Sequence, residues 1–368
     1  MARHISEIGI QSYRGITNFA VNDLSDINII VGENNCGKTS LLEAIQIINR
    51  PCDFENIVMV SRQRDRFSVV TARYTQSQYS SFLNIFNRFQ KELNISLNCK
   101  TLGNNIKLSL VGEIYESLVG EDQLAQLKTI AVGAGSGPAI DEEVKAFFGR
   151  LDVDKCDMFV SGSSIDVMLN KYSRIMRSNS SKALCPINYI SPIDHTVNDR
   201  FNEITRSKEM TRRVVELLQT SFDPEIQDLR TVEDEDGRSI RMIDHQNLGF
   251  MPLSTYGDGI KKAIALANAA ASIRDGVLLI DEYETAIHPK AMDRVFEFMI
   301  NVCMEKNIQL FLTTHSDEAL ERLLQSEGGS GNIRVITMFK NAGNTSARVL
   351  DGNKALLVRN ELGLELRQ

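Results

Sequence analysis

The chain has 368 residues, of which 42% are hydrophobic and 24% are charged, with a formal net charge of −7 and a pI of about 5.4. This is the composition of a globular protein with a sizeable core, and its acidic balance argues against a surface coated throughout by nucleic acid. No apolar run has membrane-spanning length and the first residues lack a signal-peptide pattern, so we expect a cytoplasmic protein. None of the six cysteines is spaced as Cys-x-x-Cys, so we expect reduced thiols without zinc or thioredoxin-like chemistry.

Residues 3–31 predict strands, and the last of these, residues 26–31, has the pattern of a buried strand. A glycine-rich run follows directly: Gly32, Glu33, Asn34, Asn35, Cys36, Gly37, Lys38, Thr39 and Ser40. Apolar residues then recur at helical spacing, and Pro51 ends the predicted helix. The segment therefore predicts a strand, a glycine-rich loop and a helix in succession.

Residues 32–39 of this run fit the pattern G-x-x-x-x-G-K-[ST] of a phosphate-binding loop, with the strand and the helix that this motif requires on either side. Gly32 and Gly37 allow backbone N–H groups to turn toward an anion, and the helix N-terminus adds a partial positive charge. Lys38 is placed to contact the β- and γ-phosphates, and the Thr39 hydroxyl is placed to bind Mg²⁺. We therefore predict that residues 32–40 bind Mg-ATP.

The middle of the chain carries no strong motif. Residues 55–115 predict short strands together with a helical stretch near residues 81–93, and residues 121–180 look mostly helical. The alternating arginines Arg62, Arg64 and Arg66 would share one face of a strand, and Arg212 and Arg213 form a second basic point. These arginines suggest contact with nucleic acid, but we favour solvated side chains that pair with acids.

The last third of the chain predicts strands that alternate with helices, which is typical of a parallel sheet flanked by helices. The predicted elements are a strand at 187–190, a helix at 208–220, a hairpin at 228–243, a helix at 259–271, a strand at 277–280, a helix at 290–306 and a strand at 309–314. The acidic run at 233–236 predicts a solvated hairpin tip rather than a metal site.

Two of these buried strands end in residues suited to nucleotide hydrolysis. Asp281 and Glu282 follow the strand at 277–280; the first suits the outer shell of Mg²⁺, and the second suits the polarisation of an attacking water. His315 follows the next strand, where it is placed to sense the γ-phosphate.

A second glycine-rich helix start lies before the helix at 259–271. Its glycines predict a second anion site, too far along the chain to belong to the first loop. Its candidate residues are Ser254, Gly257, Asp258 and Gly259. Two such sites in one chain suggest that two chains share each nucleotide.

The order of these four motifs resembles the ABC-type ATPase heads of the SMC, RecF and OLD proteins, over about residues 3–50 and 185–320. Residues 281–289 are similar to the Asp-Glu-x-Glu-x-x-Leu-His-Pro run of the small AAA-15- and AAA-21-like bacterial ATPases of that clan, as in the phage-defence systems Septu and PARIS. The resemblance implies that Lys38 and Thr39 form Walker A, and that Asp281 and Glu282 form Walker B with the catalytic base. His315 would be the switch histidine.

The same resemblance implies that residues 257–259 form the signature motif that caps the ATP of the partner subunit. Here the usual signature serine aligns with Gly257, and Ser254 lies three residues earlier. Gln63 is a candidate for the Q-loop glutamine. The resemblance also implies the fold: an α/β P-loop NTPase with an ABC-type head, N-terminal antiparallel strands, a parallel core sheet and a mixed helical and strand insertion.

We therefore expect an ATPase head formed by residues 1–54 and 184–368, with an insertion at 55–183. Three functions remain open. The first is a homo-oligomeric ATP-hydrolysing switch that acts on a separate nuclease or toxin, in phage defence. The second is an ATP-bound scaffold with little turnover. The third is a DNA-repair ATPase.

Overall fold

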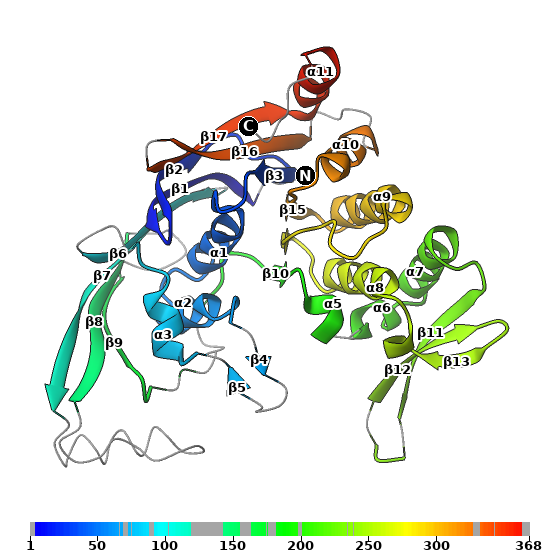
Figure 1. Cartoon of the computed structure of the whole chain (residues 1–368), viewed down its shortest axis with the longest axis horizontal. Helices are drawn as coiled ribbons and strands as arrows, with labels where there is room; N and C mark the ends of the chain where they lie inside the picture. Colours follow the sequence, from blue (N-terminus) through cyan, green and yellow to red (C-terminus); the bar gives the residue numbers. More distant parts are fainter. Residues whose placement is uncertain are drawn as a thin grey trace.

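The computed structural model describes residues 4–65, 67–68, 73–74, 76–87, 92–101, 103–118, 143–154, 163–173, 175, 182–197, 201–233, 235–237, 239–326, 332–341 and 343–362. Figure 1 shows two large sheets, and helices pack around the central one, which contains β3 (Ile27–Gly32), β14 (Gly276–Ile280) and β15 (Ile308–Thr313).

The first sheet is antiparallel and has the order β2-β1-β6-β7-β8-β9. Its strands are β1 (Ile5–Tyr13), β2 (Ile16–Val21), β6 (Leu93–Thr101), β7 (Asn104–Leu118), β8 (Glu143–Val153) and β9 (Ser163–Asn170). The strands of the middle region therefore continue the sheet that the N-terminal hairpin begins. They extend to one side of the molecule in Figure 1.

The second sheet forms the centre of the molecule and has the order β10-β14-β15-β3-β16-β17. Its strands are β3 (Ile27–Gly32), β10 (Ile187–Ile190), β14 (Gly276–Ile280), β15 (Ile308–Thr313), β16 (Ile333–Asn341) and β17 (Asn344–Asp351). All neighbours are parallel except β16 and β17, which form an antiparallel pair. Strands β3, β14 and β15 are buried along their whole length because helices or the first sheet cover both faces.

Two apolar clusters cover the two faces of this central sheet. One cluster packs Ile29 of β3 against a layer of helices: α7 (Lys208–Ser221), α8 (Asp258–Ala271), α9 (Pro289–Glu305) and α10 (Asp317–Ser326). The other packs Ile30 against α1 (Lys38–Ile48), α2 (Phe54–Ser61) and the first sheet. Alternate residues of one strand thus point into opposite cores.

Shorter elements complete the described structure. They are β4 (Phe67–Ser68), β5 (Arg73–Tyr74), α3 (Gln78–Leu83), α5 (Asp194–Val197), α6 (Asn202–Thr205), β11 (Ile226–Glu233), β12 (Ser239–His245), β13 (Gly249–Pro252), the 3-10 turn η1 (Leu253–Thr255) and α11 (Gly352–Leu362). Strands β11, β12 and β13 form a small antiparallel sheet next to α7.

The expected fold class, with antiparallel N-terminal strands and a parallel core sheet, is confirmed. Two predictions for the middle region are wrong. The helix near residues 81–93 ends at Leu83, and β6 begins at Leu93. The expected helices of residues 121–180 are wrong where the structure describes this segment, because its regular elements there are the strands β8 and β9; residues 121–142, 155–162, 174 and 176–180 lie outside the described residues. Pairing of β8 with the long strand β7, and of β9 with β8, outweighs the local helical pattern.

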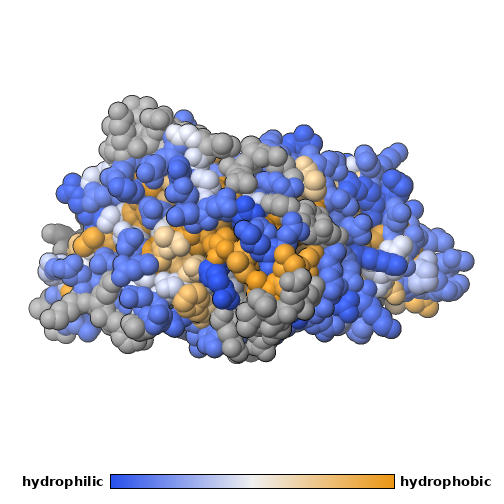
Figure 2. Space-filling model, turned by 90° about the horizontal axis from the view of Figure 1, so that it is seen from above, coloured by the Kyte–Doolittle hydropathy of each residue, from blue (hydrophilic) through white to orange (hydrophobic). Residues whose placement is uncertain are grey.

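Figure 2 views the side on which β16, β17 and α11 lie and shows a mostly hydrophilic surface with apolar side chains gathered near its middle. Within the described part of the chain, no helix combines the length and the apolar character that crossing a bilayer requires.

Candidate functional site

The predicted phosphate loop joins β3 to α1, and its backbone requires glycine at two positions. Gly32 and Gly37 have φ angles of 145° and 109°. A Cβ atom on Gly32 would lie 2.2 Å from the Met338 carbonyl oxygen, and one on Gly37 would lie 2.8 Å from Cγ1 of Ile16. Asn35 also has a positive φ, of 63°. The N-cap residue Gly37 has no side chain to cap α1, so N–H groups at the start of this helix are available to an anion.

The Lys38 ammonium folds back over this loop. It donates to the carbonyl oxygens of Gly32, at 2.8 Å, and of Glu33, at 2.9 Å. Cys36 is buried beneath the loop, and burial raises the pKa of its thiol. A thiol held in its neutral form lacks the nucleophilic character of a thiolate, so Cys36 contributes packing rather than reactivity.

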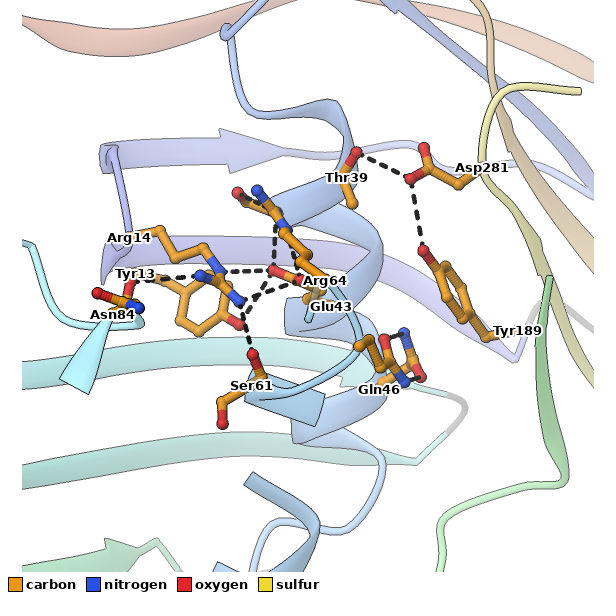
Figure 3. Close-up of polar contacts among 12 residues, drawn as sticks. Tyr13, Arg14, Thr39, Glu43, Gln46, Ser61, Arg64, Asn84, Tyr189 and Asp281 are labelled. Atoms are coloured by element: carbon orange, nitrogen blue, oxygen red, sulfur yellow. Dashed lines mark hydrogen bonds and ion pairs between the residues drawn. The ribbon is translucent and has the colours of Figure 1, made fainter. Parts of the chain in front are cut away.

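The central feature of the site is the link between Thr39 and Asp281. The Thr39 hydroxyl donates to Oδ2 of Asp281 at 2.9 Å, across 242 positions of sequence (Figure 3). Thr313, from the end of β15, donates to Oδ1 of the same carboxylate at 2.6 Å, and the Tyr189 hydroxyl donates to Oδ2 at 3.4 Å. Burial raises the pKa of Asp281, while the hydrogen bonds from Thr313 and Thr39 oppose this effect.

A hydroxyl and a carboxylate brought together in this way are hard oxygen donors of the kind that Mg²⁺ prefers. The residues present therefore fit a magnesium ion, which Thr39 and Asp281 would hold.

Glu282 follows Asp281 in a strained conformation, with a φ of 48°. Its backbone N–H donates to the Thr313 hydroxyl at 2.8 Å, and its carboxylate accepts a hydrogen bond from Thr285 at 3.2 Å. Thr313 thus fixes both acidic residues, because it donates to one carboxylate and accepts from the other residue's backbone.

His315 is positioned by Glu284. Oε1 of Glu284 accepts the backbone N–H of His315 at 2.9 Å and lies 3.1 Å from its Nδ1. The Glu284 side chain is only 10% exposed, whereas the His315 side chain is 50% exposed. A buried carboxylate therefore orients a histidine whose ring still reaches solvent.

The second glycine-rich segment begins α8, where Gly257 is the N-cap residue and no described side chain caps the helix. Ser254, Gly257 and Asp258 are exposed. A Cβ atom on Gly259 would lie 3.2 Å from the Ala286 carbonyl oxygen, so this helix start packs against the loop that follows Glu282. Among the described residues, no hydrogen bond or ion pair joins residues 254–259 to residues 32–40 of the same chain.

Lys262, one turn into α8, is fully buried, and among the described residues its ammonium has no hydrogen-bond partner. Burial lowers its pKa to about 8, and the charges of Asp194, Asp281, Glu284 and Glu282 oppose this effect. The acids that follow β14 therefore interact electrostatically with the buried Lys262 ammonium. Lys262 was not among the residues predicted from the sequence.

A second polar network holds the turn after α2. The buried carboxylate of Glu43 accepts from Arg14 Nε at 2.7 Å and from Arg64 Nε at 2.7 Å, and Arg64 also donates to Ser40 at 2.9 Å (Figure 3). Residues 62–65 form this turn, so the prediction that the arginines share a strand face is wrong. Arg66 lies outside the described residues.

The pairing of arginines with acids, which we favoured, is what the structure contains. Besides the pair of Arg64 with Glu43, Arg62 lies 3.9 Å from Asp65 and Arg213 lies 2.7 Å from Glu305. Gln63, the candidate Q-loop residue, exchanges side-chain hydrogen bonds of 3.1 and 2.6 Å with Gln46 of α1.

Asp223, Glu225 and His245 lie close enough together to suggest a metal site. However, Nδ1 of His245 accepts the backbone N–H groups of Asn247 and Leu248, both at 3.2 Å. The neutral ring must then carry its proton on Nε2, which lies 3.3 Å from each carboxylate. That proton occupies the position a metal would need, so the group is better described as a hydrogen-bonded cluster.

Two family models match the chain: "AAA ATPase domain" over residues 4–105 and "AAA domain, putative AbiEii toxin, Type IV TA system" over residues 177–321. A RecF DNA replication and repair protein of Francisella tularensis is 25% identical over 138 residues, which are 36% of this chain and 40% of the relative. The chain belongs to the ABC-type ATPases of the SMC, RecF and OLD clan.

Other similar proteins include an ATP/GTP phosphatase of Helicobacter pylori, 22% identical over 343 residues, which cover 87% of this ABC-type ATPase and 88% of the relative. An uncharacterized protein of Methanocaldococcus jannaschii is 32% identical over 112 residues, which are 30% of this chain and 98% of the relative. A solved SMC head bound to the C-terminal winged-helix domain of ScpA has a TM-score of 0.48 and 14% identity, covering 96% of this chain and all of that one.

The residues that position the predicted site residues could not be identified from the sequence. Thr313, Glu284 and Lys262 of this ABC-type ATPase carry no motif of their own, and the residues on which they act are distant in sequence. A signal existed for Glu284, because it stands within the run at 281–289 that carries the resemblance. No signal existed for Lys262, which looks like an ordinary residue of a Lys-rich helix start.

Proposed function

We propose that this ABC-type ATPase hydrolyses ATP with Mg²⁺ and acts as a nucleotide-driven switch. The observation that carries the proposal is the hydrogen bond between Thr39, at the end of the phosphate loop, and Asp281, at the end of β14. It brings the predicted Walker A and Walker B residues together at one edge of the parallel sheet, where ligands of open α/β sheets bind.

In this proposal the chain's own groups share the work of phosphoryl transfer. The N–H groups of residues 32–40 and the Lys38 ammonium bind the phosphates. Thr39 and Asp281 hold Mg²⁺, which supplies charge neutralisation when it is bound. Glu282 accepts a proton from the attacking water, and its strained backbone and Thr285 aim its carboxylate. His315, oriented by Glu284, contacts the γ-phosphate.

We propose further that two subunits sandwich each nucleotide. The start of α8 supports this because it is exposed, lacks a side-chain cap and makes no polar contact with the loop of its own chain in the described residues. Its N–H groups suit the phosphates bound by another subunit. Ser254, Gly257, Asp258 and Gly259 would then form the signature motif.

The proposed head comprises residues 1–54 and 184–368, and residues 55–183 form the insertion. The switch would act on a separate effector protein, a nuclease or toxin, in bacterial phage defence. The resemblance to the small ATPases of such systems and the matched model named for a toxin–antitoxin system support this proposal.

The test is the solution mass of the Glu282→Gln variant with and without Mg-ATP. We expect the mass to rise with Mg-ATP, because the variant binds ATP but cannot activate water. The matched control is Glu282→Gln combined with Lys38→Ala, whose mass should not respond. Turnover by the unsubstituted chain, measured as phosphate release, should be lost in Glu282→Gln.

If the mass does not change although ATP is bound, the sandwich is wrong and a pre-assembled scaffold becomes the better description. If phosphate release is equal in both chains, Glu282 is not the catalytic base.

A further inference from the structure

A cavity of about 710 Å³ lies between α1, α2 and the edge of the central sheet. One wall comes from the helices and the turn after them, and includes Gln46, Arg50, Arg62 and Gln63. The other wall is a continuous stretch of chain, residues 183–189, which leads into β10. In Figure 1, β10 lies between α1 and α2 on one side and α5 and α8 on the other.

The second wall is an open sheet edge. Among the described strands, β10 pairs with β14 alone. The carbonyl oxygens of Pro186 and Ile190 accept the N–H groups of Val277 and Asp281 on that side. Because parallel pairing uses alternate peptide groups, those of Ile187 and Tyr189 point the other way, toward the cavity. They offer N–H and C=O groups in the spacing of a strand.

The charges that line the cavity are of one sign. Arg50 and Arg62 contribute guanidinium groups, and none of the described residues that line the cavity is an aspartate or glutamate, although the chain has 48 acidic and 41 basic residues. Arg50 and Arg62 are each ion-paired, with Asp53 at 3.8 Å and with Asp65 at 3.9 Å, and their side chains are 21% and 16% exposed.

We propose that this cavity binds an extended, acidic peptide segment of a partner protein, which adds a strand to the edge of β10 that no described strand pairs. The peptide backbone would pair with Ile187 and Tyr189, and its carboxylates would lie against Arg50 and Arg62. The volume falls in the range of small-ligand and peptide sites. The sheet edge favours a polypeptide over other anions, because only a polypeptide matches alternating donors and acceptors at strand spacing.

Two residues that line the cavity connect it to the proposed nucleotide site. Tyr189 lines the cavity, and its hydroxyl donates to Asp281. Gln63 also lines it, next to Arg64, which binds Glu43 and Ser40 beside the phosphate loop. That the segment belongs to the effector rests on the proposed function, but the binding itself does not require ATP turnover.

The experiment selects a phage-displayed library of random 12-residue peptides on the full chain without nucleotide, and then measures synthetic copies of the enriched peptides by fluorescence polarisation. We expect enriched peptides rich in Asp and Glu. Affinity should fall at least about tenfold in the double variant Arg50→Gln, Arg62→Gln, because both charge partners are removed. The control for net charge, Arg206→Gln with Arg212→Gln, removes two exposed arginines beside α6 and on α7 and should leave affinity unchanged.

A separate variant tests the proposed pairing of the peptide with the backbone of β10. Ile187→Pro removes an N–H group that faces the cavity rather than β14, a position at which an edge strand tolerates proline. We expect an unchanged melting temperature and a loss of peptide binding of at least about tenfold. If this variant unfolds, the charge of the selected peptides still decides the outcome, because the proposal requires them to be acidic.

Several results would overturn the proposal. These are the failure to enrich any peptide, binding that is indifferent to the arginine pair, and displacement of the peptides by a 12-nucleotide single-stranded oligothymidylate that binds through the same arginines. None of these results bears on ATP-driven assembly of Glu282→Gln, so failure of this inference and failure of the proposed function can be told apart.

Discussion

At the scale of single residues, the candidate site depends on side chains whose hydrogen bonds orient the predicted site residues. The sequence motifs identify Asp281, Glu282 and His315, but not the threonine and the glutamate that orient them. A motif records residues close together in sequence, whereas Thr313 and Asp281 are 32 positions apart and meet only because β14 and β15 are neighbours. The positioning residues could therefore not be predicted before the strand order was known.

Thr313→Val tests this arrangement with a side chain of nearly the same shape. It removes the hydroxyl that donates to Asp281 and accepts from Glu282, at a residue that is itself fully buried. We expect the free energy of unfolding to fall by about 1–3 kcal/mol, because buried polar groups lose their partner. ATP turnover should fall, and the Mg²⁺ concentration for half-maximal turnover should rise.

The control is Thr314→Val at the next position, where the equally buried hydroxyl contacts Ser316 and not the acids. If both variants change the Mg²⁺ dependence equally, Thr313 has no particular role in positioning Asp281.

At the scale of elements, the sequence predicts a helix or strand correctly where the local residue pattern agrees with the contacts that the segment makes in the fold. The strands at 187–190 and 277–280 and the helix at 259–271 match β10, β14 and α8 closely, because each is short, apolar or bounded by glycine. The prediction fails for β8 and β9, which are edge-side strands with several exposed apolar residues. Their stability comes from cross-strand pairing that a single segment does not reveal.

Gly257→Ser tests the start of α8, where the usual signature serine aligns. Gly257 has an extended backbone, with a φ of −66°, and a Cβ atom there would meet nothing within 4 Å among the described residues. A serine fits this N-cap position, so stability should rise by roughly a few tenths of a kcal/mol. In the Glu282→Gln background, we expect Mg-ATP to drive assembly at a lower ATP concentration.

Gly259→Ser provides the contrast, because its Cβ would lie 3.2 Å from both the Ala286 carbonyl oxygen and the Phe222 ring. We expect a lower melting temperature there. Loss of assembly in a fully stable Gly257→Ser chain would mean that this helix start does not face the nucleotide of another subunit.

At the scale of the whole molecule, one buried carboxylate ties the parts together. Glu43 of α1 receives Arg14 from the first sheet and Arg64 from the turn after α2. Its side chain is 0% exposed, and the Tyr13 hydroxyl adds a hydrogen bond of 3.2 Å. In the sequence, Arg14 ends a predicted strand, Glu43 lies in a predicted helix and Arg64 belongs to a possible basic face. No sequence pattern indicates that the three residues contact one another.

Glu43→Gln should therefore destabilise the chain strongly. It leaves two guanidiniums without their buried counter-charge, which costs on the order of 3–5 kcal/mol of unfolding free energy. Denaturant unfolding measures the change. The control Glu216→Gln removes an exposed partner, 3.8 Å from Arg212, and should change stability by less than about 0.5 kcal/mol. Equal effects of the two substitutions would show that the network is not a major stabilising contact.

The open edge of β10 also bears on solubility. A strand edge that no described strand pairs is a potential template for aggregation, because a second copy of the chain can pair with it. Two copies meeting edge to edge at β10 would bring two pairs of guanidiniums, from Arg50 and Arg62 of each chain, against one another. The same charges that select an acidic segment therefore act as gatekeepers against self-pairing, so that one feature serves both recognition and protection from misassembly.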